Sequence, residues 1–261
     1  MLDVLKEVFR YRELLWSLAE RDLKIRYKQS FLGVAWALFT PLATMLIFAL
    51  VAYAQILKVD TGGVPYMIFA YCGILPWTFF ASTLSTSTSC LVSNSNLITK
   101  IYFPREVFPL SLLLSKFVDF LLAAVVLVAL MIYYRVPLRL PIVALPMLVL
   151  VQVLFMIGMS FFLSMGNLFY RDVKYVFDVV ITLWMFGTSV IYPIQLKNPL
   201  FQQIFLLNPM TPIINGYRNV VIFGIWPDCR ELLPVLVIVL AVFWAGTYYF
   251  HRNEFLFAER I

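Results

Sequence analysis

The sequence predicts an all-α integral membrane protein with six transmembrane helices in a single domain, residues 1–261. Apolar residues make up 62% of the chain and charged residues only 13%, and the charges are confined to a few short stretches. The stretches between them reach the roughly 20 apolar residues that a helix needs to cross a bilayer. A soluble helix would carry polar residues on one face, and these stretches lack that pattern.

The predicted spans are residues 31–56, 65–90, 110–134, 141–169, 173–192 and 232–250. The first lies between Lys28 and Lys58 with no charge between them. The second lies inside a charge-free interval that runs from Thr61 to Thr99, and the fourth carries no charge at all.

The third span contains two charges near one end, Lys116 and Asp119. They are three residues apart and share a helix face, so we expect them to neutralise each other. A catalytic or proton-relay role is the alternative, because charges inside a membrane are candidates for function. Asp178 in the fifth span is expected at a helix end, near the membrane interface.

The basic residues predict the orientation of the chain. With both termini cytoplasmic, the cytoplasmic flanks hold 14 of the 20 Lys and Arg residues and the external flanks hold 6. Cytoplasmic loops retain such an excess during insertion. The positive charge therefore indicates topology, and no motif for nucleic-acid binding accompanies it. A charged segment of about 30 residues precedes the first apolar run, so that span is expected to serve as the insertion signal.

Residues 1–28 predict an amphipathic helix at the membrane interface. Apolar residues recur on one face at Val4, Val8, Tyr11, Leu15 and Leu18. Such a helix lies with its apolar side toward the acyl chains, and the basic cluster that follows it would contact anionic membrane lipids. Packing against a partner protein is the alternative.

Residues 193–231 form an apolar external segment that is interrupted by Asn208-Pro209 and Thr211-Pro212. Each apolar piece is too short to cross the bilayer. We expect two short re-entrant helices bordering a pathway, because irregular backbone at membrane depth needs protein or water around it. An external cap resting on the membrane is the alternative.

Residues 94–109 are predicted to form a cytoplasmic loop with a short helix bounded by Pro104 and Pro109. Ile98, Ile101 and Tyr102 have the spacing of one helix face, with basic side chains beside them available to a partner.

The sequence shows no motif for catalysis, ATP binding or metal binding. No glycine is followed by lysine, so the phosphate-binding loop of ATPases is missing and any ATP must bind to another polypeptide. Three separated cysteines and a single histidine, His251, predict neither a metal site nor a disulfide framework. We expect no catalytic residue and no cofactor in this chain.

Four stretches, in order, resemble signatures of the ABC-2 type permeases that export polysaccharides, O-antigen permeases above all. They are residues 15–41, 101–106, 167–173 and 208–214. The resemblance implies a homodimeric channel in the inner membrane, with two nucleotide-binding ATPase subunits that hold ATP and Mg. It also implies a lipid-linked polysaccharide substrate that moves from the cytoplasmic to the external side.

The resemblance also assigns two groups of residues. In this family the first cytoplasmic loop docks on the ATPase, which implies a coupling role for Ile98, Lys100, Ile101, Tyr102, Phe103, Arg105 and Glu106. The family places the first and fifth spans along the pore, where aromatic side chains would let a sugar chain slide. The glycan-contact candidates are Trp36, Phe39, Tyr53, Phe177, Trp184 and Tyr192. Lipid contact or internal packing is the alternative for each.

The sequence is also compatible with other functions. Teichoic-acid and capsule permeases are near relatives of the same family, and an ABC-2 exporter of another amphiphile is a further alternative. A membrane-embedded glycosyltransferase or acyltransferase would need a paired acidic motif or a histidine-centred site, and neither is present. A structural scaffold is disfavoured by the predicted pore-bordering segment.

Overall fold

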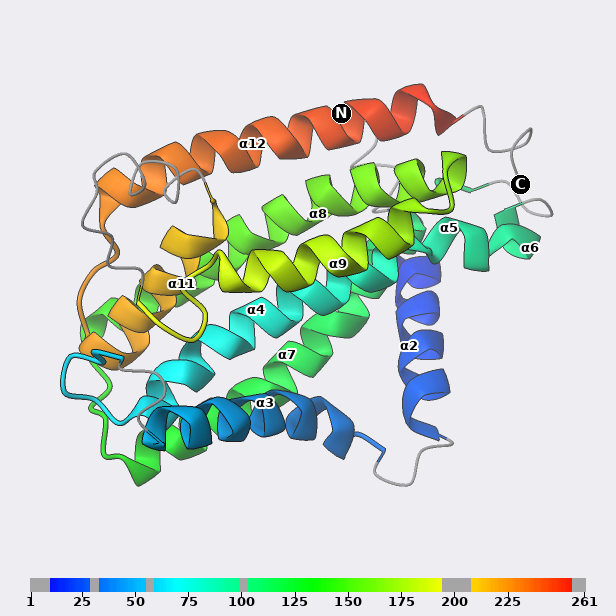
Figure 1. Cartoon of the computed structure of the whole chain (residues 1–261). Helices are drawn as coiled ribbons and strands as arrows, with labels where there is room; N and C mark the ends of the chain where they lie inside the picture. The colour runs from blue at the N-terminus through cyan, green and yellow to red at the C-terminus, as the bar shows by residue number, and fades with distance from the viewer. Residues whose placement is uncertain (1–9, 29–32, 55–58, 99–102, 194–207, 255–261) are drawn as a thin grey trace.

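The computed structural model describes residues 10–28, 33–54, 59–98, 103–193 and 208–254, and every regular element in these ranges is helical. In chain order they are α2 (Arg12–Lys28), α3 (Ala35–Tyr53), α4 (Tyr66–Thr88), α5 (Cys90–Ser93), α6 (Ser95–Ile98), α7 (Val107–Tyr133), the 3-10 helix η1 (Leu140–Ala144), α8 (Leu145–Phe169), α9 (Val173–Phe186), α11 (Met210–Arg218), the π-helix η2 (Asn219–Phe223) and α12 (Cys229–Arg252). The long helices form an elongated bundle (Figure 1).

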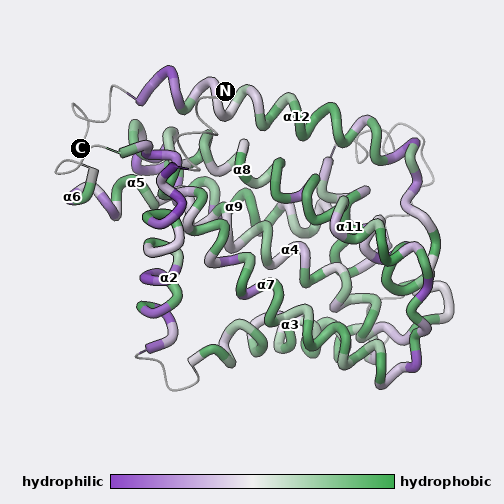
Figure 2. The backbone as a smooth tube through the Cα atoms, turned by 180° about the vertical axis from the view of Figure 1, so that it is seen from behind, coloured by the Kyte–Doolittle hydropathy of each residue, from purple (hydrophilic) through white to green (hydrophobic). Residues whose placement is uncertain are grey.

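Among the described residues, five segments are long and apolar enough to cross a membrane: Ala35–Tyr53, Tyr66–Thr88, Val107–Tyr133, Leu140–Phe169 and Cys229–Arg252. Their apolar character is visible along the tube in Figure 2. Each coincides with a predicted span. The chain is therefore an integral membrane protein.

The predicted fifth span, residues 173–192, is only partly helical. α9 has 14 residues and ends at Phe186. At 1.5 Å per residue it is about 21 Å long, shorter than the hydrocarbon core of about 30 Å. The helix stops at Gly187, whose N–H donates to the carbonyl of Leu183 at 3.1 Å. Five of the six predicted spans therefore correspond to helices long enough to cross a membrane, and the predicted fifth span corresponds to a short helix that packs beside α4 and α8.

α4 is the central helix of the bundle. It packs against α3, α7, α8, α9 and α11, and its buried residues lie on all sides of the helix. A helix that is apolar all round is expected in such a position. The other spans present broad apolar faces outward, as helices do where the surrounding solvent is lipid.

α8 and α12 pack with their backbones in close approach. A Cβ atom on Gly246 would lie 2.3 Å from the carbonyl oxygen of Gly158, and one on Gly158 would lie 2.6 Å from the carbonyl oxygen of Val242. Small residues allow this approach between membrane helices.

α2 and α11 lie at opposite ends of the bundle, and α2 runs across the direction of the long helices (Figures 1 and 2). A second core cluster at the α2 end contains Leu18, Phe103, Phe108 and Phe250. It brings α2, the loop before α7 and the end of α12 together. These three segments therefore lie at one end of the bundle.

The apolar face predicted on the N-terminal helix is used inside the protein. Leu18 is buried, and Tyr11 and Leu15 pack against the same cluster, while Trp16 is exposed. Val4 and Val8 lie outside the described residues. The face thus packs on the protein's own bundle, which neither the membrane nor the partner interpretation anticipated.

The predicted external segment is described at Pro193 and from Asn208 onward, and its first predicted helix lies outside the described residues. α11 and η2 form the second, and nearly all of α11 is buried. Gln152 on α8 connects this segment to α4, because its amide donates to the carbonyl of Pro76 at 2.8 Å and accepts from the hydroxyl of Tyr217 at 3.0 Å. α11 is therefore part of the bundle core and does not rest on its surface.

Candidate coupling and transport sites

The loop before α7 is described from Phe103 to Glu106, and apart from the half-buried Arg105 its residues are buried. Phe103 is only 6% exposed, and its ring centroid lies 5.4 Å from that of Phe108. Glu106 is also buried, and Arg105 donates to the carbonyl of Glu254 at 3.0 Å. Of the seven coupling candidates, these three therefore contact the protein itself.

The other coupling candidates lie at the edge of what is described. Ile98 is the last residue of α6, and Lys100, Ile101 and Tyr102 fall outside the described residues. The expectation that Pro109 closes a short helix is wrong. α7 begins at Val107 and runs through Pro109. Proline is tolerated in a first turn, because the N–H groups there have no acceptor within the helix. The short helices are α5 and α6, which precede the loop.

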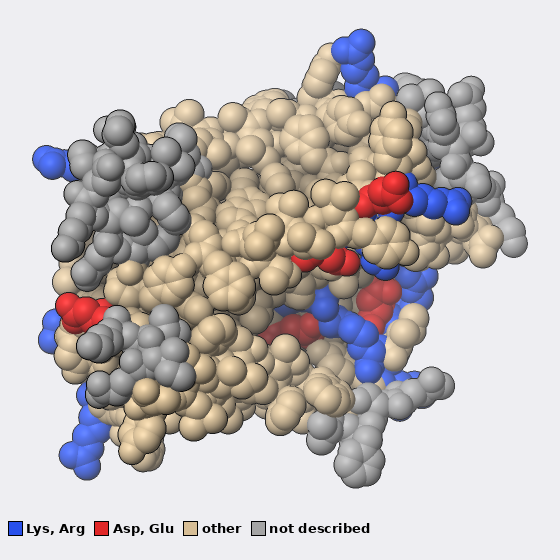
Figure 3. Space-filling model, viewed as in Figure 1, with Lys and Arg blue, Asp and Glu red and all other residues tan. Residues whose placement is uncertain are grey.

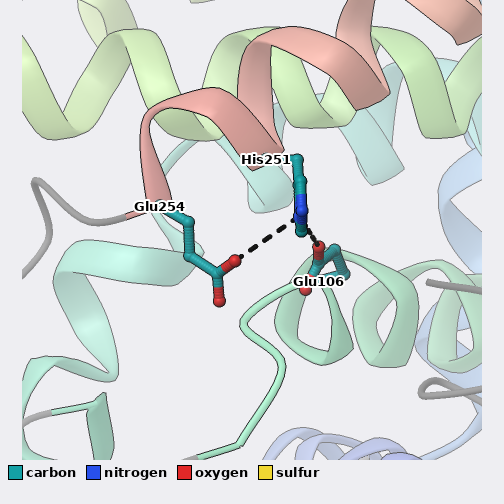
Figure 4. Close-up of side chains that lie close together, drawn as sticks. All are labelled: Glu106, His251 and Glu254. Atoms are coloured by element: carbon teal, nitrogen blue, oxygen red, sulfur yellow. Dashed lines mark ion pairs between the residues drawn. The ribbon is translucent and has the colours of Figure 1, made fainter. Parts of the chain in front are cut away.

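His251 lies between two carboxylates at the same end of the bundle (Figure 4). Its Nδ1 is 3.7 Å from Oε1 of Glu106 and 3.5 Å from Oε2 of Glu254. Burial, together with the nearby charge of Glu254, raises the pKa of Glu106 above its ordinary value. Through these contacts His251 connects the end of α12 to the start of α7. Sequence reasoning missed the group, because Glu106 is 145 residues away from His251.

The same three side chains are the candidates for a metal among the described residues, because their ligand atoms all lie within 4.8 Å of one another. One imidazole and two carboxylates would suit a transition metal such as zinc.

Lys116 and Asp119 lie near each other, as predicted, but Asp119 also has partners on α2. Their charged atoms are 3.9 Å apart. The Asp119 carboxylate also accepts hydrogen bonds from the guanidinium of Arg26 and the hydroxyl of Tyr27, and Arg26 donates to Ser115 as well. Burial and this hydrogen bond raise the pKa of Tyr27, so its hydroxyl stays protonated and donates. The cluster fastens α2 to α7.

The six glycan-contact candidates fall into two groups. Trp36, Phe39 and Tyr53 on α3 are exposed, with Tyr53 89% exposed. Phe177 is buried, and Trp184 packs against Phe80 with ring centroids 5.3 Å apart.

Tyr192 is half-buried and donates to the carbonyl of Phe186. The predicted face of α9 is thus directed into the protein's own core. The exposed residues of α9 are mostly apolar: Tyr175, Val176, Val179, Val180, Leu183 and Phe186, together with Lys174, Asp178 and Thr182.

Arg218 is a buried residue that sequence reasoning counted only as an external charge. It donates to the carbonyls of Ser189 and Val190, each at 2.5 Å, and to that of Phe69 at 3.3 Å. Gly73 leaves the space for this contact, because a Cβ atom there would lie 2.2 Å from the Val190 carbonyl oxygen. The arginine thereby supplies donors to the non-helical backbone that follows α9.

Asn208 fixes the same backbone from the other side. Its amide donates to the carbonyl of Gly187 at 3.0 Å and to the hydroxyl of Thr188 at 2.8 Å, and it accepts from Nε1 of Trp184 at 2.9 Å. Irregular backbone at membrane depth requires such partners. This requirement explains why polar residues occur in an otherwise apolar segment.

A sequence profile of the family described as "ABC-2 type transporter" matches residues 13–222. The chain belongs to the ABC-2 type transporter family. As a member, it is the membrane subunit of a transporter, which agrees with its five long apolar helices.

Named relatives match this ABC-2 subunit over almost its whole length. It is 29% identical over 263 residues to "O-antigen export system permease protein RfbA" of Myxococcus xanthus, covering 100% of both chains. It is 31% identical over 250 residues to a protein of the same name from Klebsiella pneumoniae, covering 95% of this chain and 94% of the relative.

Proposed function

We propose that this ABC-2 permease is the transmembrane subunit of an ATP-driven exporter that moves lipid-linked O-antigen polysaccharide from the cytoplasmic to the external side of the inner membrane. The full-length similarity to O-antigen export permeases carries the proposal. Two copies form the channel, and two separate ATPase subunits bind ATP and Mg.

The arrangement of the bundle supports a cytoplasmic end at which such ATPases dock. α2, the loop before α7 and the end of α12 gather at one end of the molecule. These segments also hold most of the basic residues of the terminal flanks, as cytoplasmic segments do. In this proposal both termini are cytoplasmic and residues 98–102 contact the ATPase.

Export of a teichoic acid, a capsular polysaccharide or another amphiphile is the second candidate within the family. The names of the relatives, which are O-antigen export permeases, favour O-antigen.

Deletion of the coding sequence in the native host tests the function. We expect surface O-antigen to disappear from intact cells and the lipid-linked polymer to accumulate inside, with both effects reversed by a plasmid copy. Antibody labelling of intact and permeabilised cells measures the two pools. Loss of a different surface polymer would identify the second candidate, and unchanged surface polymers would rule out polysaccharide export.

A further inference from the structure

A cavity of about 320 Å³ lies between α2, α3, α4 and α7. Its lining includes Arg26, Lys116 and Asp119, together with Trp36, Thr40 and Thr78. Figure 3 shows a hollow between α3 and the rest of the bundle, in which acidic and basic side chains gather. Its volume is at the lower end of the range of small-molecule sites.

The charges that line this cavity do not balance. Asp119 is the single acid among them, and it accepts from Arg26 and Tyr27. Lys116 lies 3.9 Å from Asp119, and within the described ranges its ammonium group donates no hydrogen bond. Asp22 on α2 pairs with Arg21 at 3.3 Å and does not line the cavity. One positive charge is therefore left for a ligand.

The residues around the cavity are of the kinds that occur near lipid phosphates. Lys116 is nine residues into α7, about 14 Å along a helix of 27 residues. α2, which runs across the bundle end, supplies Arg26, and Trp36 lies at the start of α3. Tryptophan and basic residues are enriched at the level of the headgroups. The position therefore favours an anionic group carried on a lipid.

We propose that this cavity binds the phosphate group of a lipid headgroup, with Lys116 as its principal cationic partner and Arg26 as the second. An ammonium group is a compact donor that suits a phosphate. Arg26 retains further N–H groups beyond those bonded to Asp119 and Ser115. The hydroxyls of Thr40 and Thr78 donate to backbone carbonyls of their own helices and can turn toward the ligand.

Two sources could supply this phosphate, the lipid anchor of the exported glycan and the anionic phospholipids of the membrane. The first source rests on the proposed function and the second does not. In either case the phosphate occupies the same contacts, so a binding measurement on the permease alone tests the site.

The test uses native mass spectrometry of the purified full-length permease. The probes are phosphatidic acid, diacylglycerol diphosphate, uncharged diacylglycerol and inorganic diphosphate. We expect the two phosphate lipids to bind at least tenfold more tightly than diacylglycerol. If the site holds the glycan anchor, the diphosphate lipid should bind more tightly than phosphatidic acid. Equal binding of phosphate and uncharged lipids would overturn the proposal. Free diphosphate binding as tightly as the lipids would overturn its assignment to a lipid.

Lys116→Met tests the residue that carries the proposal. We expect this variant to lose most of the preference for phosphate and Lys116→Arg to keep it. The substitution leaves in place the hydrogen bonds that Arg26 and Tyr27 donate to Asp119, so we expect the variant to fold. Lys24→Met is the matched control, because Lys24 is an exposed base of α2 that pairs with Glu20 and does not line the cavity. An unchanged preference in Lys116→Met, or an equal loss in Lys24→Met, would contradict the assignment.

The outcome is separable from that of the proposed function. Neither glycan nor ATPase is needed for the binding measurement. If phosphate lipids bind as expected while deletion of the gene leaves surface polysaccharides unchanged, the function fails and the site remains. If deletion removes surface O-antigen while phosphate lipids bind no more tightly than uncharged diacylglycerol, the proposed site is wrong and the proposed function stands.

Discussion

Neighbouring residues of the loop before α7 have different structural roles. Phe103 is buried in the cluster that joins α2, α5 and α12, so its side chain is committed to the fold. Replacing it by alanine leaves a cavity, which costs about 3–5 kcal/mol for a buried phenylalanine. The coupling contact that the family resemblance implies must therefore depend on the residues just before it.

Tyr102→Ala and Phe103→Ala should consequently fail in different ways. We expect Tyr102→Ala to keep the permease folded while reducing co-purification of the ATPase at least tenfold. Phe103→Ala should lower the apparent melting temperature of the permease itself. Co-purification through a tag on the permease, together with a melting curve of the isolated chain, separates the two effects. Full retention of the ATPase by Tyr102→Ala would argue against docking at this position.

At the scale of elements, α8 and α12 depend on the close approach at Gly158 and Gly246. The Cβ atom of a substituted Gly246 would meet backbone at 2.3 Å, and backbone cannot move aside as a flexible side chain can. Since both helices span the membrane, their separation would disturb the whole second half of the bundle. A single methyl group is thus enough to test the packing.

Gly246→Ala should destabilise the permease by about 1–3 kcal/mol or more, the cost of overpacking a core. Thermal unfolding of the purified chain, followed by tryptophan fluorescence, measures it. Gly187→Ala is the matched control, because its Cβ atom would lie 3.6 Å from the nearest carbonyl oxygen, at ordinary contact distance. Equal melting temperatures for the two variants would show that the two helices do not pack as described.

At the scale of the whole molecule, the outward faces of α3 and α9 are mainly apolar and aromatic, although Asp178 and Thr182 are also exposed on α9. On α9 this face includes Val179 and Leu183, while the face with Phe177 and Ile181 packs inward. In the proposed dimer, α9 lies beside the channel. Its outward face, and not the face with Phe177 and Trp184, would then meet the second copy or the glycan.

Cysteine cross-linking tests this arrangement. In a Cys229→Ser background, which removes the exposed native cysteine and leaves the buried Cys72 and Cys90, we expect Leu183→Cys to give disulfide-linked dimers. Val125→Cys, on the exposed face of α7, should remain monomeric on the same non-reducing gel. Dimers from Val125→Cys and none from Leu183→Cys would place the contact elsewhere.

The sequence predicted the helical class and the position of five spans to within a few residues. It could do so because the length of an apolar stretch is a local property that the thickness of the bilayer converts directly into a helix. It also indicated that Asn208 and the proline-interrupted segment around it lie against protein or water, because polar and helix-breaking residues at membrane depth need partners for their backbone groups.

Other features were decided by tertiary structure alone. Arg26 meets Asp119 across 93 residues, Arg218 reaches the carbonyl of Phe69 across 149, and His251 meets Glu106 at the bundle end. Which face of α9 packs inward was likewise decided by tertiary structure, because in a membrane protein both faces of a helix are apolar and periodicity does not distinguish the core from lipid. Which side chains pair depends on how distant helices pack, and packing is not encoded in any one segment.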